Sequence, residues 1–135
     1  MQQRLSPQIY AANTQIIANG HLHLVSDFFS EDYVVHLTAQ DVSGGHKMIR
    51  NALGVLRSAF PDIGIEVAIL VEREDRVAWQ RTLKGTQLGA YKGFPASGRT
   101  IEWRDMVTSR FRNGLIVEEW VVTDLAERLL LSRKR

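Results

Sequence analysis

The feature that most constrains this sequence is a change of hydrophobic period at Pro61. Before Pro61, apolar residues recur every three or four positions, as they do on one face of a helix. After Pro61, apolar and polar residues alternate, as they do in strands that bury one face. Helices followed by alternating strands are typical of an α+β domain, in which the helices cover one face of an antiparallel sheet.

Local signals place the boundaries of these elements. Ser6-Pro7 is a favourable helix start because a capping hydroxyl precedes a proline, and Asn19-Gly20 is a favourable end. Asn113-Gly114 predicts a tight hairpin, since both turn positions require positive φ. The expected elements are helices over 7–19 and 21–29, an extended segment over 33–37, a third helix capped by Ser43 and ended by Pro61, strands over 63–71, 77–85, 100–112 and 115–123, and a last segment over 125–131 that is either helical or extended.

A helical layer on four long strands predicts a strongly bent sheet that can enclose a pocket. In such a cone, apolar side chains fill the narrow end and a small apolar molecule fits in the mouth, where convergent polar groups would fix its orientation. The 135 residues fit one domain over 1–135, without a linker or an internal repeat.

Composition removes several classes of function. The chain has no cysteine, which excludes disulfides, a thiolate nucleophile and cysteine-bound metal. The formal net charge is +2, but the basic residues 133–135 end the chain in a tail expected to be disordered over 132–135, and the rest is nearly neutral. No basic face favours nucleic acid, no apolar run approaches the roughly 20 residues that span a membrane, and no secretory signal is recognised at the start. We therefore expect a cytoplasmic protein that binds neither nucleic acid nor membrane.

The last expected strand leads to a carboxylate that shares a face with a tryptophan. Alternation places Trp120 and Asp124 on one face of the strand and Glu119 on the other. A carboxylate that loses hydration beside an indole becomes a plausible base for removing a proton next to a carbonyl group. Alternatively, Asp124 precedes a terminal helix as its N-cap. The alternation along the strand is compatible with both roles of Asp124, a base in the pocket and the N-cap of a terminal helix.

Other candidate residues have similar alternatives. His36 can point into the cavity as a proton shuttle or a hydrogen-bond donor, or it can be structural. Asp105 can form a carboxylate pair with Asp124 around a water, which would suit epoxide opening, or it can form a surface ion pair. No metal site is expected, because the histidines lack ligand spacing. The three tryptophans of the last three strands either line the pocket or belong to the core: Trp79, Trp103 and Trp120.

Four motifs follow one another in a specific order: Ala59-Phe60-Pro61-Asp62, Gly85-Thr86-Gln87-Leu88-Gly89, the segment from Gly93 to Arg99, and the segment from Arg110 to Trp120 with Asp124. Together they resemble the SnoaL-like polyketide cyclase family of the NTF2-like superfamily over roughly residues 9–130. The resemblance implies an α+β cone, ring closure by intramolecular aldol condensation without metal or cofactor, and an acid-base aspartate that matches Asp124. Gln87 stands where many relatives carry histidine; its amide can bind an enolate oxygen but cannot shuttle a proton.

The residues and the resemblance together lead to one hypothesis with alternatives. We expect a cofactor-independent cyclase or isomerase acting on a small apolar carbonyl compound, with Asp124 as the base and His36 or Gln87 as donors to the enolate. Tyr33 would shape the pocket with the tryptophans. The alternatives are a pocket that binds a small ligand without catalysis, a dimerisation module, and an enzyme that resembles epoxide hydrolases. A homodimer is expected because an open sheet leaves one face exposed.

Overall fold

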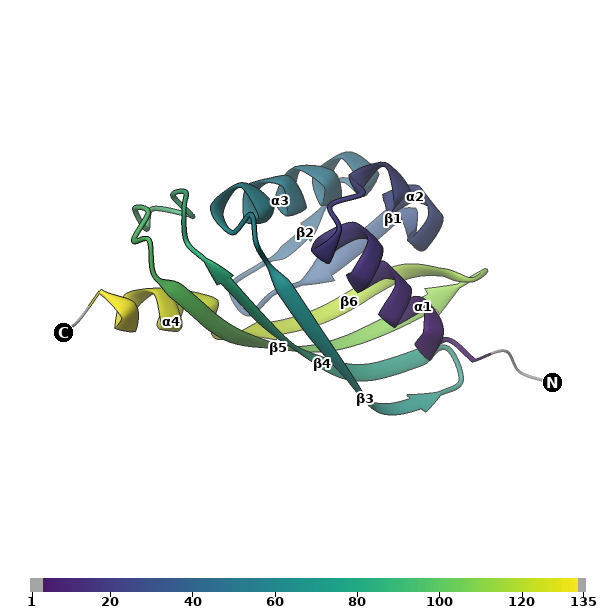
Figure 1. Ribbon diagram of the computed structural model, residues 1–135. Helices are drawn as coiled ribbons and strands as arrows, with labels where there is room; N and C mark the ends of the chain where they lie inside the picture. Colours follow the sequence, from purple (N-terminus) through teal and green to yellow (C-terminus); the bar gives the residue numbers. More distant parts are fainter. Residues whose placement is uncertain (1–3, 134–135) are drawn as a thin grey trace.

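The computed structural model describes residues 4–133, which fold into a curved six-stranded sheet with helices on one face (Figure 1). This is the predicted α+β cone. The elements in chain order are α1 (Ser6–Ala12), a π-helical segment (Asn13–Ala18), a 3₁₀ turn (Leu22–Leu24), α2 (Val25–Phe28), β1 (Phe29–His36), β2 (Asp41–Ser43), α3 (Gly45–Ala59), β3 (Gly64–Arg73), β4 (Arg76–Thr86), β5 (Thr100–Arg112), β6 (Leu115–Thr123) and α4 (Leu125–Ser132).

The first helix begins at the predicted place, but its cap comes from a distant strand. The carboxylate of Glu72 on β3 accepts hydrogen bonds from the backbone N–H of Leu5 (2.8 Å) and of Ser6 (2.9 Å) and from the Ser6 hydroxyl (2.5 Å). These bonds, the hydroxyl bond foremost, lower the pKa of Glu72 below its ordinary value. Ser6 is therefore a donor to a carboxylate and not the expected capping acceptor, and Glu72 ties α1 to the sheet.

The strand order in the sheet is β2-β1-β6-β5-β4-β3, and the two outer strands do not pair with each other. The meander from β3 to β6 is antiparallel, as predicted, whereas β1 runs parallel to β6. The short strand β2 was not predicted; it contains Ser43, and α3 instead begins after Gly44 without a side-chain cap. Residues 125–132 form the helical alternative of the last segment.

Two apolar clusters fill the space between the helices and the sheet. One lies under α1 and includes Ile9, Ile16 and Trp79, and the other includes Phe60, Trp103 and Leu129. In Figure 1, α1, α2 and α3 lie on the same side of the sheet, while α4 extends beyond one end of it. The helices and the curved sheet leave a cavity between them, which is described below.

Two further predictions concern the C-terminal tail over 132–135 and the absence of a membrane-spanning segment. Ser132 closes α4 and Arg133 follows it, whereas the remaining tail residues 134–135 lie outside the described residues. Among residues 4–133, no helix has the length and apolar character needed to cross a membrane.

Candidate active site

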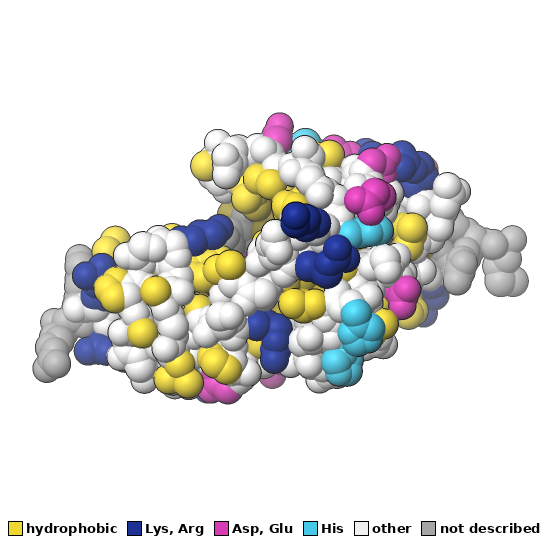
Figure 2. Space-filling view, turned by 90° about the horizontal axis from the view of Figure 1, so that it is seen from above, with side chains coloured by type: hydrophobic (Ala, Val, Ile, Leu, Met, Phe, Trp, Pro, Cys, Tyr) yellow, Lys and Arg dark blue, Asp and Glu magenta, His cyan; other side chains and the backbone are white. Residues whose placement is uncertain are grey.

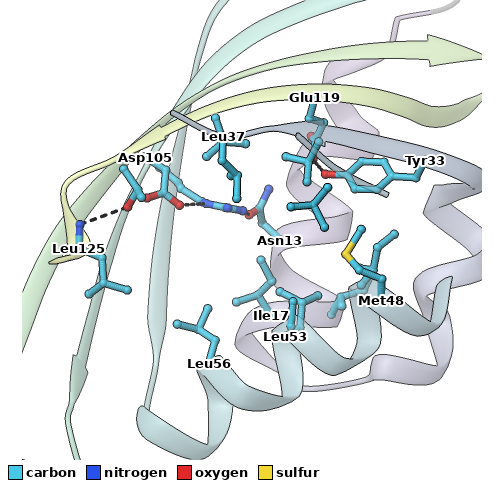
Figure 3. A pocket seen from close by; sticks show the side chains of 18 of the residues that line it. Asn13, Ile17, Tyr33, Leu37, Met48, Leu53, Leu56, Asp105, Glu119 and Leu125 are labelled. Atoms are coloured by element: carbon cyan, nitrogen blue, oxygen red, sulfur yellow. Dashed lines mark hydrogen bonds and ion pairs between the residues drawn. The ribbon is translucent and has the colours of Figure 1, made fainter. Parts of the chain in front are cut away.

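A cavity of about 620 Å³ opens between the helical layer and the inner face of the sheet. Seen from the helical side, the surface is hollowed and hydrophobic side chains border the hollow (Figure 2). Most of the wall is apolar, with side chains from α1, the π-helical segment, α3, β1 and the meander. In the close view, Leu53, Leu56 and Met48 of α3 lie across this space from Asp105 and Glu119 of the sheet, and Asn13 lies between them (Figure 3).

Strand register brings three polar side chains into one row of the wall. Arg81 on β4 pairs directly with Asp105 on β5, and Asp105 pairs directly with Thr123 on β6. Directly paired residues in an antiparallel sheet project to the same face. All three line the cavity. The sheet thus delivers a cation, a carboxylate and a hydroxyl to one position.

Arg81 is held on two sides. Its Nε donates to Oδ2 of Asp105 at 2.8 Å, and one terminal nitrogen donates to Oδ1 of Asn13, also at 2.8 Å. The Asn13 amide is fixed in turn, because its nitrogen donates to the carbonyl of Ile9 at 2.8 Å. The guanidinium also lies 5.2 Å from the centre of the Trp79 ring. Within residues 4–133 the other terminal nitrogen of Arg81 has no hydrogen-bond partner, so it can donate to a ligand.

Asp105 is the least satisfied group of the wall. Its side chain is only 8% exposed, and Oδ2 is bound by Arg81. Oδ1 is the one buried side-chain oxygen or nitrogen in residues 4–133 that lacks a hydrogen-bond partner. A buried acceptor left unpaired costs about 1–3 kcal/mol, and such groups in native structures call for an explanation, of which a catalytic role is one.

A second buried carboxylate, Glu119, belongs to a chain of hydrogen bonds. Glu119 accepts from the Tyr33 hydroxyl at 2.7 Å and from the Ser109 hydroxyl, which itself accepts from Trp79 Nε1 at 2.9 Å. Burial raises the pKa of Glu119 above its ordinary value, against the opposing effects of these hydroxyls and of Arg81. Burial, with the Glu119 charge second, also holds the pKa of Tyr33 well above its ordinary value. The cavity therefore has two carboxylates in contrasting surroundings, an arrangement found in acid-base sites.

Comparison with known proteins agrees with the fold and the cavity. Residues 8–130 match the SnoaL-like polyketide cyclase family. The chain belongs to this family. Among solved structures, it is similar to IdmH, a candidate polyketide cyclase from Streptomyces antibioticus, at 27% identity and a TM-score of 0.78 over 96% of this chain and 97% of that one. The chain is also similar to AclR, a candidate hydroxylase from Streptomyces galilaeus, at 27% identity and a TM-score of 0.78, with 96% of this chain and 82% of that one covered.

A third structure shows how far the fold extends beyond sequence similarity. A candidate polyketide cyclase from Acidithiobacillus ferrooxidans has 17% identity to this chain and a TM-score of 0.83, with 97% of each chain covered. No curated protein matches this sequence. The comparisons therefore give the family and the NTF2-like fold, and the chemistry depends on the site itself.

The structure separates the predicted site residues of this SnoaL-like chain into two groups. Four of them line the cavity: Tyr33, Trp79, Trp103 and Asp105. The other four do not: His36, Gln87, Trp120 and Asp124. The three residues assigned to catalysis from sequence all fall in the second group.

Asp124 does not line the cavity as expected, because its side chain is bound to β5 and to the first turn of α4. Its Oδ1 accepts from the backbone N–H of Arg104 at 2.8 Å, and its Oδ2 accepts from Arg128 Nε at 3.1 Å. The residue stands at the N-cap position, but its side chain bonds the backbone of β5 and the Arg128 side chain of α4, and it makes no capping hydrogen bond to the backbone of the first helical turn. The expected carboxylate pair of Asp105 and Asp124 is not formed, since each carboxylate has its own arginine.

His36 and Trp120 lie on the outer face of the sheet. Parallel pairing of β1 with β6 makes them direct neighbours, and their rings stack at 5.1 Å. Nδ1 of His36 is 2.8 Å from Asp41, and Nε2 is 2.6 Å from Glu118. Hydrogen bonds to these carboxylates, Glu118 foremost, raise the pKa of His36 above its ordinary value of 6.5. This histidine joins three strands and does not line the cavity.

Gln87 is buried, and its side chain is hydrogen-bonded within the loop that follows β4. Its amide nitrogen donates to the carbonyls of Gly89 (3.3 Å) and Phe94 (3.2 Å), and its oxygen accepts from the Ser97 hydroxyl at 2.9 Å. Every polar atom of the side chain is thus engaged within the loop. The expected role as a donor to an enolate does not fit this position.

Sequence reasoning missed Asn13, Arg81 and Glu119 as site residues. Arg81 and Glu119 each carry a charge on a strand face that is otherwise apolar, which is a recognisable signal. Asn13 interrupts an apolar helical stripe in the same way, at the start of the π-helical segment. Segments of this kind occur often at functional sites.

The His36 contacts lead to a prediction about stability. Because the folded-state pKa of His36 is raised, its contribution is fully present below about pH 6.5 and is lost as pH rises through the folded-state value. We therefore expect His36→Gln to lower the melting temperature by several degrees near pH 6 and by less near pH 9. His21→Gln is the control, since its ring lies beside that of His23 and has no hydrogen bond or ion pair with any of residues 4–133. A His36→Gln effect independent of pH would contradict the prediction.

Proposed function

We propose that this protein is a cofactor-independent cyclase or isomerase that removes a proton next to the carbonyl group of a small, largely apolar compound. The observation that carries this proposal is the buried Oδ1 of Asp105, an acceptor without a partner on a carboxylate whose other oxygen is fixed by Arg81. Asp105 therefore replaces Asp124 as the proposed base.

The wall of the cavity supports this class of substrate. Its volume of about 620 Å³ suits a small organic molecule, for which pockets of roughly 300–1,000 Å³ are usual. Aliphatic and aromatic side chains from helices and strands would bury the body of the ligand. The polar groups gather around Arg81 and Asp105, which suits a ligand with a carbonyl group at one position.

The proposed chemistry assigns one role to each side chain. Oδ1 of Asp105 accepts the proton, and the C–H electron pair forms the carbon–carbon double bond of an enolate while the carbonyl π electrons move to oxygen. The free terminal nitrogen of Arg81 donates to that oxygen as its charge develops. In a cyclase, the enolate carbon then attacks a second carbonyl of the same molecule, and protonated Asp105 returns its proton to the alkoxide that forms. In an isomerase, protonated Asp105 returns the proton at another carbon.

Exchange with heavy water tests the proposal without knowledge of the natural substrate. The wild-type protein is incubated in D₂O with a panel of aryl and alicyclic ketones, and loss of the α-proton signals is followed by NMR. We expect at least one ketone to exchange faster with protein than with buffer, and exchange to saturate with ketone concentration. Saturable binding without exchange would instead support the alternative, a pocket that binds a small ligand without catalysis.

A further inference from the structure

Two turns contribute residues to the outer part of the cavity lining, and we call these residues the rim; all of them except the half-buried Tyr91 are exposed. One turn, between β1 and β2, contributes Thr38, Ala39 and Gln40. The other contributes Tyr91 and Lys92 from the loop between β4 and β5. Tyr91 and Phe94 hold this second turn together, because each backbone N–H donates to the other's carbonyl, at 2.9 and 2.8 Å.

Lys92 occupies a backbone position that an L-residue adopts at a cost. Its φ is +43° and that of the following Gly93 is +87°. Two-residue turns with positive φ at both positions favour Asn-Gly, and a left-handed conformation costs an ordinary side chain roughly 1–2 kcal/mol. Lysine is therefore not the residue that this turn favours, although the turn between β3 and β4 accepts Glu74 at a similar φ of +56°.

The charge of Lys92 is unmatched at the rim. Its ammonium lies 5.5 Å from the centre of the Tyr91 ring and forms no ion pair with any of residues 4–133. The other polar side chains of the rim are the neutral hydrogen-bonding groups of Thr38, Gln40 and Tyr91. The carboxylates of the wall, Asp105 and Glu119, already have partners inside the cavity. The rim thus presents a cation and neutral polar groups but no carboxylate.

We propose that the ligand carries a carboxylate at its outer end and that Lys92 binds this group at the rim. This inference rests on the proposed function, which places the carbonyl group against Arg81 and Asp105. The substrate class is then an apolar keto acid, whose body spans the wall between the two polar ends. Lys92 is the residue that selects the acid over a neutral compound of the same shape.

Displacement of a neutral fluorescent reporter measures this selection. N-phenyl-1-naphthylamine is bound to the full-length protein and displaced by decanoate or by decan-1-ol, which share a chain length and differ in charge. We expect decanoate to bind better than the alcohol to wild type, and the advantage to shrink at high salt. Lys92→Asn should weaken decanoate binding roughly three- to fivefold, as expected for an exposed ion pair, and leave decan-1-ol unchanged.

Two further variants separate charge from folding. Lys92→Arg should keep the preference for decanoate, and Lys84→Asn, which removes an exposed charge away from the cavity, should keep it as well. Lys92→Asn should not lower the melting temperature, because asparagine tolerates left-handed φ better than lysine. The melting temperature thus distinguishes weaker binding caused by the lost charge from weaker binding caused by misfolding.

The outcomes separate this inference from the proposed function. An unchanged ratio of decanoate to decan-1-ol affinity in Lys92→Asn overturns the role of Lys92, even if neutral ketones still exchange in D₂O. A ratio that falls in Lys92→Asn supports it, even if no ketone exchanges and the catalytic proposal fails. Equal affinity of wild type for the acid and the alcohol also overturns it.

Discussion

Replacing Asp105 with asparagine is expected to slow α-proton exchange by about 10²- to 10⁴-fold, the usual contribution of a positioned base. Asparagine has the same shape, and its amide oxygen can still accept from Arg81 Nε, so the wall should be preserved. An amide cannot take up the proton at neutral pH. Binding of the neutral reporter should therefore remain within several-fold of wild type, and ketone exchange in D₂O should nearly disappear.

Asp124→Asn is the matched control. It makes the same chemical change on a carboxylate that is bound to the Arg104 backbone and to Arg128, outside the cavity. We expect its exchange rate to be close to that of wild type. The opposite result, loss of exchange in Asp124→Asn and its retention in Asp105→Asn, would return the role of base to Asp124 and sink the assignment made from the cavity geometry.

Most of the fold could be predicted from the sequence because its signals are local. The Asn113-Gly114 turn and the alternation on both sides of it predict strands over 100–112 and 115–123, and β5 and β6 have these bounds. The pairing of β1 with β6 joins segments about 80 residues apart, and no local pattern encodes it. Strand β2 is three residues long, too short to show alternation.

The candidate site was harder to predict, because a β-bulge changes which residues of β6 face inward. Phe111 pairs with Ile116 and Arg110 pairs with Glu118, so residue 117 has no direct partner. Ile116 and Glu119 therefore both line the cavity, although regular alternation places them on opposite faces. Alternation correctly grouped Glu118 with Trp120, but it could not show that this group faces outward.

The Arg81 cluster depends on contacts between distant parts of the chain. Asn13 and Arg81 are 68 positions apart, and Arg81 and Asp105 are 24 apart. Neither separation produces a motif. A charged residue on an apolar strand face indicates that it needs a partner. Only the sheet register and the position of the π-helical segment show that the partners of Arg81 are Asp105 and Asn13.

Replacing the Arg81 guanidinium with an uncharged side chain is expected to have the largest effect on stability. Arg81→Met leaves the carboxylate of Asp105 buried without a partner and removes the nearby positive charge that favours ionised Glu119. Breaking a buried pair from one side costs about 3–5 kcal/mol. We expect the free energy of unfolding, measured by urea titration, to fall by about 3 kcal/mol, at the lower end because the Arg81 side chain is 18% exposed.

Two comparisons show whether the pair serves the fold or the site. Arg112→Met breaks an ion pair to Asp32 whose side chains are 50% and 63% exposed, and it should cost no more than about 1 kcal/mol. An equal loss in Arg81→Met and Arg112→Met would contradict the burial argument. The double variant Arg81→Met, Asp105→Leu leaves neither charge uncompensated and should recover most of the stability lost in Arg81→Met. Recovered stability would show that the ion pair is dispensable for folding, and loss of exchange in the same variant, which lacks the proposed base, would agree with a role of the pair in the site.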